Sequence, residues 1–373
     1  SFSLYMTHGG TSWGHWAGAN SPGFSPDVTS YDYDAPINEA GQVTPKYMEL
    51  REMLSGYSDK KLPSIPKEFP VINVPKIQFT EVAPLFENLP APHASMDIQT
   101  MEAFNQGWGS ILYRTKTPAV PTQSILTITD AHDFAQVFIN GKLIGSIDRR
   151  NHEKTMLLPA MKEGDQLDIL VEAMGRINFG RAIKDFKGIT EKVELSYTMN
   201  TGSQVTVNLK NWQIYTLSDS YQVQKDMKYV PLKDQKVPGC YRATFNLKKT
   251  GDTFLNLETW GKGQVYVNGH AIGRFWKIGP QQTLYMPGCW LKKGENEIIV
   301  QDIVGPQETV VEGLSKPIID KLNVDAPNTH RKEGQTLNLA GETPCKTGEF
   351  DAGNGWQEVR FDQPVTGRYV CIE

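Results

Sequence analysis

Apolar and polar residues alternate in short runs along most of this chain, from about residue 78 onward, and Gly, Asp and Asn separate the runs. A period of two residues predicts strands with one buried face, and turn residues between them predict antiparallel pairing. The expected fold class is therefore mainly β, built from sandwiches. The same alternation over residues 1–7 predicts a strand at the start of the chain.

One helix is predicted near the start, between Thr44 and Gly56. Thr44 suits an N-cap and Pro45 suits the first helical turn. Three apolar residues of this segment fall on one helical face, namely Tyr47, Leu50 and Leu54. A strand, a long loop and a helix in this order make one βα unit of an incomplete TIM barrel.

The β region repeats itself. Residues 137–145 (VFINGKLIG) match residues 265–273 (VYVNGHAIG), which places Asn140 and Asn268 at an offset of 128 residues (268 minus 140). The pairs at 113–114 and 241–242, both Tyr-Arg, keep the same offset. Because Asn-Gly between two strands is typical of a tight hairpin, the repeat predicts two similar sandwiches of the jelly-roll type.

Shifts in composition give the expected domain boundaries. Residues 1–60 hold the strand, loop and helix, and the proline-rich residues 61–77 form a semi-rigid linker. The first sandwich is expected over residues 78–205, the second over 206–312, and a tail over 313–373.

Composition excludes several classes of protein. The formal net charge of -4 over 373 residues, with both signs spread along the chain, argues against nucleic acid as a partner. No apolar stretch approaches the length of a membrane span, and no leader peptide is visible. The seven histidines and four cysteines have no metal-binding spacing, so neither a metal nor another cofactor is expected. Cys240 and Cys289 could pair, or all four thiols could be free and buried.

Several motifs carry a resemblance to one enzyme family. Residues 8–11 (HGGT), 29–36 (TSYDYDAP), 39–41 (EAG) and 44–47 (TPKY) closely resemble the last barrel strand, loop and helix of glycoside hydrolase family 35, the retaining β-galactosidases. That family carries galactose-binding-like jelly-roll domains after its barrel, which fits the two predicted sandwiches. Residues 356–372 resemble the start of a truncated discoidin-like (F5/8 type C) domain.

The resemblance implies hydrolysis of terminal non-reducing β-D-galactose by two glutamates, an acid/base and a nucleophile. Both would precede Ser1, so the chain is expected to hold no catalytic residue and to be inactive alone. Tyr33 matches the tyrosine that hydrogen-bonds the galactose in this family. The candidates for the rim or the support of the sugar pocket are Trp13, His15, Trp16, Asp32 and Asp34.

Other residues are given ordinary roles. Glu39, although preceded by Asn38, is interpreted as a solvated loop carboxylate. The tryptophans of the β region could be sugar platforms but are more simply core residues, namely Trp108, Trp260, Trp276 and Trp290. The segments 175–180 and 185–189 resemble a stretch that packs against neighbouring domains in the family.

Two hypotheses about function remain. In the first, the chain is the C-terminal portion of a retaining β-galactosidase, its partners are β-galactoside glycans and the remaining N-terminal barrel of the same protein, and its location is periplasmic or secreted by family analogy. In the second, it is a free-standing galactoside-binding sandwich module. The unit at residues 1–60 favours the first, because a self-contained module has no use for it. A related specificity for another β-linked sugar also stays open.

Overall fold

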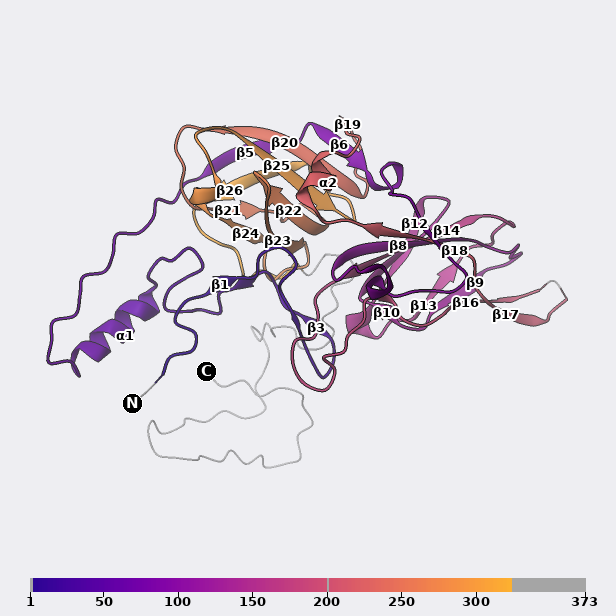
Figure 1. Ribbon diagram of the computed structural model, residues 1–373, viewed down its shortest axis with the longest axis horizontal. Coiled ribbons are helices and arrows are strands. Elements are labelled where there is room, and N and C mark those ends of the chain that lie inside the picture. The colour runs from indigo at the N-terminus through magenta and orange to yellow at the C-terminus, as the bar shows by residue number, and fades with distance from the viewer. Residues whose placement is uncertain (1–2, 200, 324–373) are drawn as a thin grey trace, which may run out of the picture. The chain divides into compact units, whose positions relative to one another are not determined.

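The computed structural model describes residues 3–199 and 201–323 (Figure 1). Contacts divide the chain into two units, residues 1–330 and 331–373, and all elements described here belong to the first. The predicted mainly β class is confirmed. The described residues contain two α-helices, α1 (Pro45–Ser55) and α2 (Tyr221–Lys225), and four 3-10 turns: Leu85–Glu87, Met101–Phe104, Arg149–Asn151 and Gly288–Trp290.

The first sandwich pairs a six-stranded sheet of order β12-β11-β14-β8-β18-β7 with a four-stranded sheet of order β13-β9-β16-β17. The strands of the larger sheet are β7 (His93–Ser95), β8 (Gly109–Lys116), β11 (Phe134–Ile139), β12 (Lys142–Asp148), β14 (Gln166–Ala173) and β18 (Trp212–Leu217). The smaller sheet holds β9 (Ser124–Ile128), β13 (Thr155–Leu158), β16 (Val193–Thr198) and β17 (Gln204–Asn208). A separate pair joins β10 (Ala131–His132) and β15 (Gly188–Ile189).

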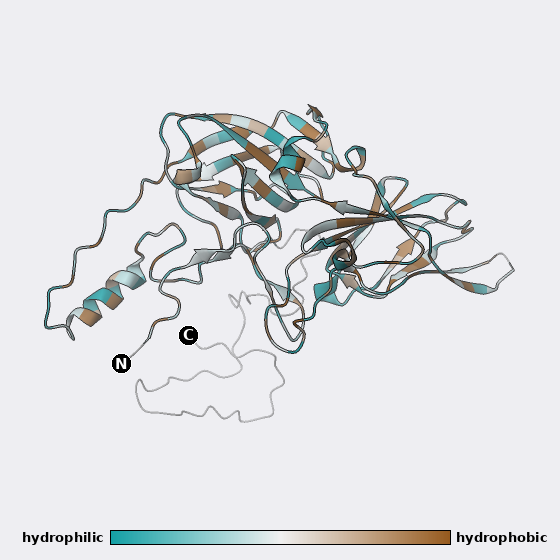
Figure 2. Cartoon of the chain, in the orientation of Figure 1, coloured by the Kyte–Doolittle hydropathy of each residue, from teal (hydrophilic) through white to brown (hydrophobic). Residues whose placement is uncertain are grey.

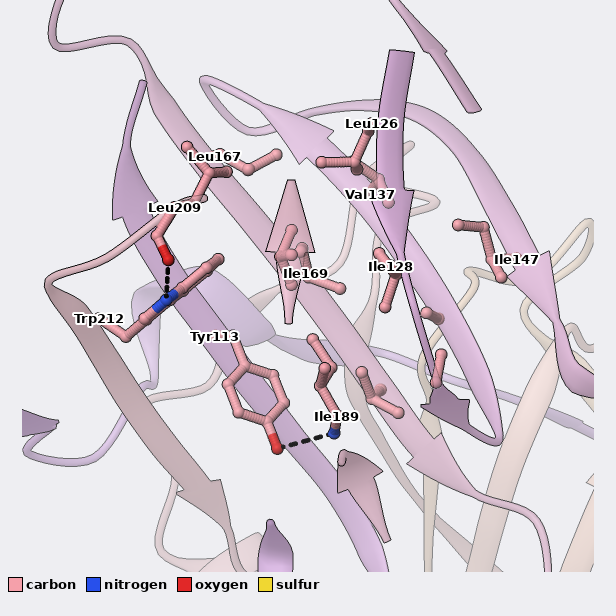
Figure 3. Close-up of a cluster of buried hydrophobic side chains, with 14 of the residues drawn as sticks. Tyr113, Leu126, Ile128, Val137, Ile147, Leu167, Ile169, Ile189, Leu209 and Trp212 are labelled. Atoms are coloured by element: carbon pink, nitrogen blue, oxygen red, sulfur yellow. Dashed lines mark hydrogen bonds between the residues drawn. The ribbon is translucent and has the colours of Figure 1, made fainter. Parts of the chain in front are cut away.

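The core of this sandwich contains polar groups that are hydrogen-bonded inside it (Figure 3). The hydroxyl of Tyr113 accepts a hydrogen bond from the Ile189 amide at 3.1 Å and donates one to the Gln99 carbonyl at 2.8 Å. The indole of Trp212 donates to the Leu209 carbonyl at 3.1 Å. Because each buried polar tip is satisfied, these large rings can fill the core without an unpaired donor.

The second sandwich has the same layout, with sheets of order β19-β6-β20-β25-β22-β23 and β24-β21-β26-β5. The larger sheet holds β6 (Glu81–Pro84), β19 (Val230–Pro231), β20 (Gly239–Leu247), β22 (Lys262–Val267), β23 (His270–Trp276) and β25 (Gly294–Asp302). The smaller sheet holds β5 (Val74–Gln78), β21 (Thr253–Asn256), β24 (Thr283–Met286) and β26 (Val310–Leu314).

The predicted repeat is visible in detail. Asn140 and Gly141 have φ angles of 49° and 77°, and Asn268 and Gly269 have 48° and 89°. Positive φ at both positions is what a tight hairpin turn requires, and Asn-Gly meets it at low steric cost. Each hairpin also has one register shift, between Val137 and Phe138 and between Val265 and Tyr266.

The observed domain boundaries differ from the predicted ones. β5 pairs with β26 and β6 pairs with β20, so residues 74–84 belong to the second sandwich and the first is inserted into it. β18 pairs with β8, so residues 212–217 belong to the first sandwich. Strands β17 and β18, the last two of the first sandwich, thus occupy the positions that β5 and β6 occupy in the second. Local alternation predicts strands but does not specify their partners across the chain.

The N-terminal segment has less regular structure than predicted. It contains β1 (Gly10–Thr11), β2 (Ala19–Asn20), β3 (Ser25–Pro26) and β4 (Ser30–Tyr31), and residues 3–7 contain no strand. A strand forms only where a neighbour accepts its backbone hydrogen bonds, so the predicted barrel strand is not among these elements. Helix α1 forms as expected, with the Thr44 side chain accepting from the Tyr47 amide.

Helix α1 buries none of its residues. In Figure 2 it carries both hydrophobic and hydrophilic positions, and Met48 and Met53 are exposed. Residues 61–73, most of the predicted linker, form neither helix nor strand. In residues 3–199 and 201–323, no helix combines the length and the apolar character needed to cross a membrane.

Two predictions concern cysteines and the C-terminal tail. Cys240 is buried and Cys289 is exposed, and both are free thiols, so their pairing is wrong. The Cys240 thiol lies 2.7 Å from the Gln224 side-chain oxygen, and burial raises its pKa. The proposed discoidin-like start and the remaining cysteines, Cys345 and Cys371, lie outside the described residues.

Candidate sugar-contacting loop and its supports

Tyr33 lies on an exposed part of the loop that follows β4. The residue is 64% exposed, and its ring meets the ring of Tyr31 edge-on at a centroid distance of 5.0 Å. Partial burial and the nearby Asp27 carboxylate raise the pKa of the Tyr33 phenol. The phenol therefore stays protonated at neutral pH and can donate a hydrogen bond to a ligand oxygen.

The two aspartates beside Tyr33 have different surroundings. The Asp32 carboxylate accepts hydrogen bonds from the backbone amides of Ala35 at 3.3 Å and Glu39 at 3.0 Å. Asp34 is exposed and forms an ion pair with Lys46 of α1. Asp32 thus fixes the turn after Tyr33, whereas Asp34 links the loop to the helix.

Glu39 is not the solvated carboxylate that the sequence suggested. It is only 5% exposed, and its carboxylate accepts hydrogen bonds from the hydroxyls of Thr11 at 2.6 Å and Ser30 at 2.9 Å. Burial raises the pKa of Glu39 to about 7, although the two hydroxyls oppose the shift. The β1–β4 pairing brings these hydroxyls together, a contact that local sequence does not reveal.

The loop is bonded to the second sandwich. Arg274 is half-buried and donates to the backbone carbonyls of Ala17 at 3.0 Å and Asp27 at 3.3 Å. The Thr29 hydroxyl donates to the Arg274 carbonyl, and the Arg274 amide donates to that hydroxyl, each at 2.9 Å. A Cβ on Gly273, whose φ is +139°, would lie 2.3 Å from Thr29 Cγ2, so only glycine permits this approach.

The loop also contacts the first sandwich. The Ala19 amide donates to the Arg176 carbonyl at 2.9 Å, and Ala19 forms a parallel bridge with Ile177. A Cβ on Gly175 would lie 2.4 Å from the Gly18 carbonyl oxygen. This segment of the first sandwich thus packs against the N-terminal loop, as its resemblance to an interface stretch implied.

A group of charged residues, called here the charge cluster, lies beneath the same contact. Its members are Asp130, His132, Asp133, Arg149, Asp185 and Lys187. Lys187 is fully buried, and its ammonium lies 2.7 Å from Asp133 and 2.6 Å from Asp185. Arg149 bonds the same two carboxylates at 2.7 and 2.8 Å. Both cations also contact the ring of Phe24 from the loop, at 4.3 Å for Arg149 and 4.8 Å for Lys187.

The protonation states within the charge cluster follow from these contacts. Burial favours neutral His132, but hydrogen bonds to Asp130 and Asp185 outweigh it and raise the pKa of His132 to about 9. The hydrogen bond from His132 lowers the pKa of Asp130 to about 2. Burial opposes ionisation of Asp185, yet His132 and Lys187 hold its pKa well below the usual range. His132 is therefore protonated at neutral pH, whereas Asp130 and Asp185 are ionised.

Geometry alone would allow a metal ion at part of this cluster. In the described part of the chain, His132, Asp133 and Asp185 have ligand atoms within 4.8 Å of one another. An ion there would have to displace Lys187 and Arg149 from the carboxylates and remove a proton from His132. The residues present fit an internally neutral ion network rather than a metal centre.

The remaining candidates from the sequence lie in different environments. Trp13 is half-buried and packs against the core of the second sandwich, with its ring 4.5 Å from that of Trp290. His15 is nearly buried, 3.5 Å from Asp219. Trp16 is 75% exposed and lies 5.3 Å from Trp108 between ring centroids. In these contacts none of the three side chains reaches Tyr33, whose ring meets that of Tyr31.

Most tryptophans of the sandwiches are structural. Trp260 is fully buried and its indole donates to the Val310 carbonyl at 3.0 Å. Trp276 lies under the cations of Arg150 and Lys262, each 4.0 Å from its ring centroid. Trp290 stacks on His270 at 4.4 Å. Trp108 is the exception, since it is 42% exposed.

A cavity of about 500 Å³ lies between β18 of the first sandwich and β20 and β25 of the second. Its acidic lining residues include Glu87, Asp226 and Asp302. Asp302 is fully buried and accepts hydrogen bonds from four backbone amides, among them Gly261 at 2.6 Å and Gly305 at 2.8 Å. These hydrogen bonds stabilise the turn around Asp302, so its carboxylate is not available to a substrate.

Family comparisons agree with this arrangement. Residues 1–57 match the model of glycosyl hydrolases family 35, residues 99–218 that of the beta-galactosidase first all-beta domain, and residues 238–296 that of the beta-galactosidase galactose-binding domain. The chain belongs to glycosyl hydrolase family 35. Its family-35 segment holds Tyr33 and Glu39, and the all-beta match covers β8 to β18, in agreement with the observed first sandwich.

Relatives in this family are about one-third identical to the chain over the aligned residues. Beta-galactosidase-1-like protein 3 of Rattus norvegicus is 36% identical over 80% of this chain and 48% of its own length. Beta-galactosidase of Xanthomonas manihotis is 35% identical over 77% of this chain and 47% of its own length. Beta-galactosidase of Bos taurus is 32% identical over 85% of this chain and 52% of its own length. The chain thus spans about half the length of the curated relatives it matches.

Likenesses to solved structures are weak. An alpha-L-rhamnosidase of Streptomyces avermitilis has a TM-score of 0.24 at 12% identity and covers 63% of this chain and 27% of its own. A lectin of Pleurotus ostreatus has a TM-score of 0.23 at 11% identity and covers 67% of this chain and 80% of its own. TM-scores this low do not establish a shared fold.

Proposed function

We propose that this chain is the part of a retaining β-galactosidase that supplies a sugar-contacting loop and two accessory sandwiches. The reaction is hydrolysis of terminal non-reducing β-D-galactose from glycans. One observation carries the proposal: the family-35 match with its exposed Tyr33 is followed, in order, by the two β-galactosidase domain matches. The relatives named beta-galactosidase support the same substrate class.

Retaining hydrolysis needs two carboxyl groups roughly 5 to 5.5 Å apart, one as nucleophile and one as acid and then base. In this proposal both come from the remaining N-terminal barrel of the same protein. Tyr33 contributes a protonated phenol that donates to a galactose hydroxyl. Asp32 and Glu39 hold the backbone on either side, so that the phenol is oriented before the sugar binds.

The chain by itself is expected not to hydrolyse an aryl β-galactoside. The reason is that both catalytic carboxyl groups are proposed to lie in the barrel, whereas the neighbouring carboxylates of Asp133 and Asp185 are buried and bound by Lys187 and Arg149. The measurement is release of the coloured phenol, with the full-length protein as the positive control. Hydrolysis by the 41.8 kDa chain alone, confirmed by intact mass, would contradict the proposal.

In the full-length protein, Tyr33→Phe is expected to lower kcat/KM for an aryl β-galactoside by about 10- to 100-fold. This is the loss of one hydrogen bond worth roughly 1.5–3 kcal/mol in the transition state. Tyr57→Phe is the matched control, because Tyr57 is an exposed tyrosine just after α1 and should be silent. Equal activity of the two variants would remove Tyr33 from the sugar site.

A free-standing galactoside-binding module is the second candidate, and the galactose-binding domain match at residues 238–296 favours it. The exposed methionines of α1 argue for the enzyme instead, because a barrel would cover them. A periplasmic or secreted location is part of the proposal by family analogy. Fractionation of the producing cells tests that location.

A further inference from the structure

Trp16 and Trp108 form an exposed pair of indole rings, called here the indole pair. The residues are 75% and 42% exposed, and their rings are inclined by 50° at a centroid distance of 5.3 Å. Trp16 comes from the N-terminal loop and Trp108 from the segment just before β8. Adjacent exposed aromatic rings are unusual on a folded protein and mark a surface that another molecule covers.

The backbone that carries Trp108 is held by several side chains. The Gln106 amide group donates to the carbonyls of Trp108 at 3.0 Å and Ser110 at 2.8 Å. The Arg176 guanidinium donates to the Gly107 carbonyl at 2.8 Å. Because this ring is fixed before any ligand arrives, binding would cost little additional ordering.

A polar group borders the indole pair. The Asp219 side chain is 32% exposed, and burial raises the pKa of its carboxyl while the nearby indole of Trp108 opposes that shift. His15 lies 3.5 Å away, and its pKa is lowered to about 3 by burial and by the charges of Arg274 and Lys262. Since the imidazole is neutral at pH 7, it does not neutralise Asp219. The carboxylate keeps oxygen lone pairs for donors outside the protein.

Further polar atoms beside Asp219 have unused hydrogen-bonding capacity. Both ring nitrogens of His15 and the side-chain oxygen of Gln106 are buried without a hydrogen-bond partner among the described residues. Gln106 and Asp219 flank Gly109, on which a Cβ would lie 3.7 Å from Gln106 Nε2 and 3.8 Å from Asp219 Cβ. Because an unpaired buried polar group is destabilising, the gathering of these groups next to an exposed aromatic surface points to a missing polar ligand.

We propose that Trp16, Trp108 and Asp219 form a carbohydrate-binding site that takes a hexopyranose unit of a glycan. A pyranose ring presents C–H groups on one face, which match the electron-rich indole faces, and hydroxyl groups at its edge, which match Asp219. A purely apolar ligand would leave the carboxylate unpaired. The site does not include Tyr33, although Trp16 comes from the same N-terminal loop, and it holds whether or not the proposed hydrolysis does.

The test is calorimetric and NMR titration of this chain with a galacto-oligosaccharide and a gluco-oligosaccharide. We expect at least one to bind in the roughly millimolar range, and Trp16→Ala and Trp108→Ala each to weaken binding about tenfold or more. Trp16→Tyr, which keeps a flat ring, should retain most of the affinity. Phe69→Ala, at an exposed aromatic residue of the linker, is the matched control and should bind as the unchanged chain does.

Asp219→Asn separates the polar contribution from the aromatic one, and it should weaken binding while the fluorescence of the indole pair stays that of a folded chain. Three results overturn the proposal: neither sugar binds, both tryptophan variants bind as the unchanged chain does, or the unchanged chain is a dimer that Trp16→Ala converts to a monomer. The last result would mean that a second copy covers the indole pair.

Discussion

Lys187→Met is expected to lower the free energy of unfolding by about 3–5 kcal/mol, the cost of removing one partner from a buried ion pair. The ammonium of Lys187 is fully buried against Asp133, Asp185 and the Gly175 carbonyl, at 2.6–2.7 Å. Methionine fills a similar volume but leaves two buried carboxylates with fewer donors. Urea unfolding followed by fluorescence of the chain measures the change.

Lys192→Met is the matched control for that substitution. Lys192 pairs with Glu194 at 2.9 Å on the surface, and exposed pairs contribute about 0–1 kcal/mol. The double variant Lys187→Met with Asp133→Asn should regain part of the loss, because one of the orphaned charges is then gone. If Lys187→Met unfolds within about 1 kcal/mol of the unchanged chain, the charge cluster does not stabilise the first sandwich as argued.

Glu39→Gln is expected to reduce the loss in the free energy of unfolding that the chain shows as the pH rises. The pKa of Glu39 rises from 4.5 in the unfolded chain to about 7 in the folded one. A raised folded-state pKa favours the folded, protonated form below about pH 4.5, and this advantage is lost as the pH rises through about 7. The loss amounts to about 3 kcal/mol between those limits, since each pKa unit corresponds to about 1.4 kcal/mol.

The measurement is the free energy of unfolding at several values between about pH 5 and about pH 9, for the unchanged chain and for Glu39→Gln. His132 also titrates near the upper end, with a folded-state pKa of about 9, so the readout is the difference between the two proteins. That difference should grow in favour of Glu39→Gln as the pH rises. Glu49→Gln, at an exposed position of α1, should show no such trend. Parallel curves for Glu39→Gln and the unchanged chain would contradict a buried, protonated Glu39.

Local chemistry explains which features could be predicted from the sequence. Asn140-Gly141 and Asn268-Gly269 form the expected turns because only their own φ angles are needed. Helix α1 begins at the expected cap because the Thr44 side chain bonds an amide three residues away. The motif around Tyr33 likewise identified the family from consecutive residues. Each of these features depends on neighbours in the chain.

Other features depended on residues far apart in the sequence. The strand β6 joins the second sandwich through β20, where Glu81 also pairs with Arg242 across 161 residues, so alternation alone misassigned it. Glu39 looked solvated because its burial comes from the pairing of β1 with β4.

The sequence by itself thus determined the mainly β class, the two repeated hairpins, the capped helix and the family. Tertiary structure alone decided how the strands are shared between the sandwiches, which carboxylates are buried, and that Trp16 meets Trp108 beside Asp219. The physical reason is that turns and caps are satisfied within a few residues, whereas burial, pKa and side-chain pairing are set by whatever the fold places alongside.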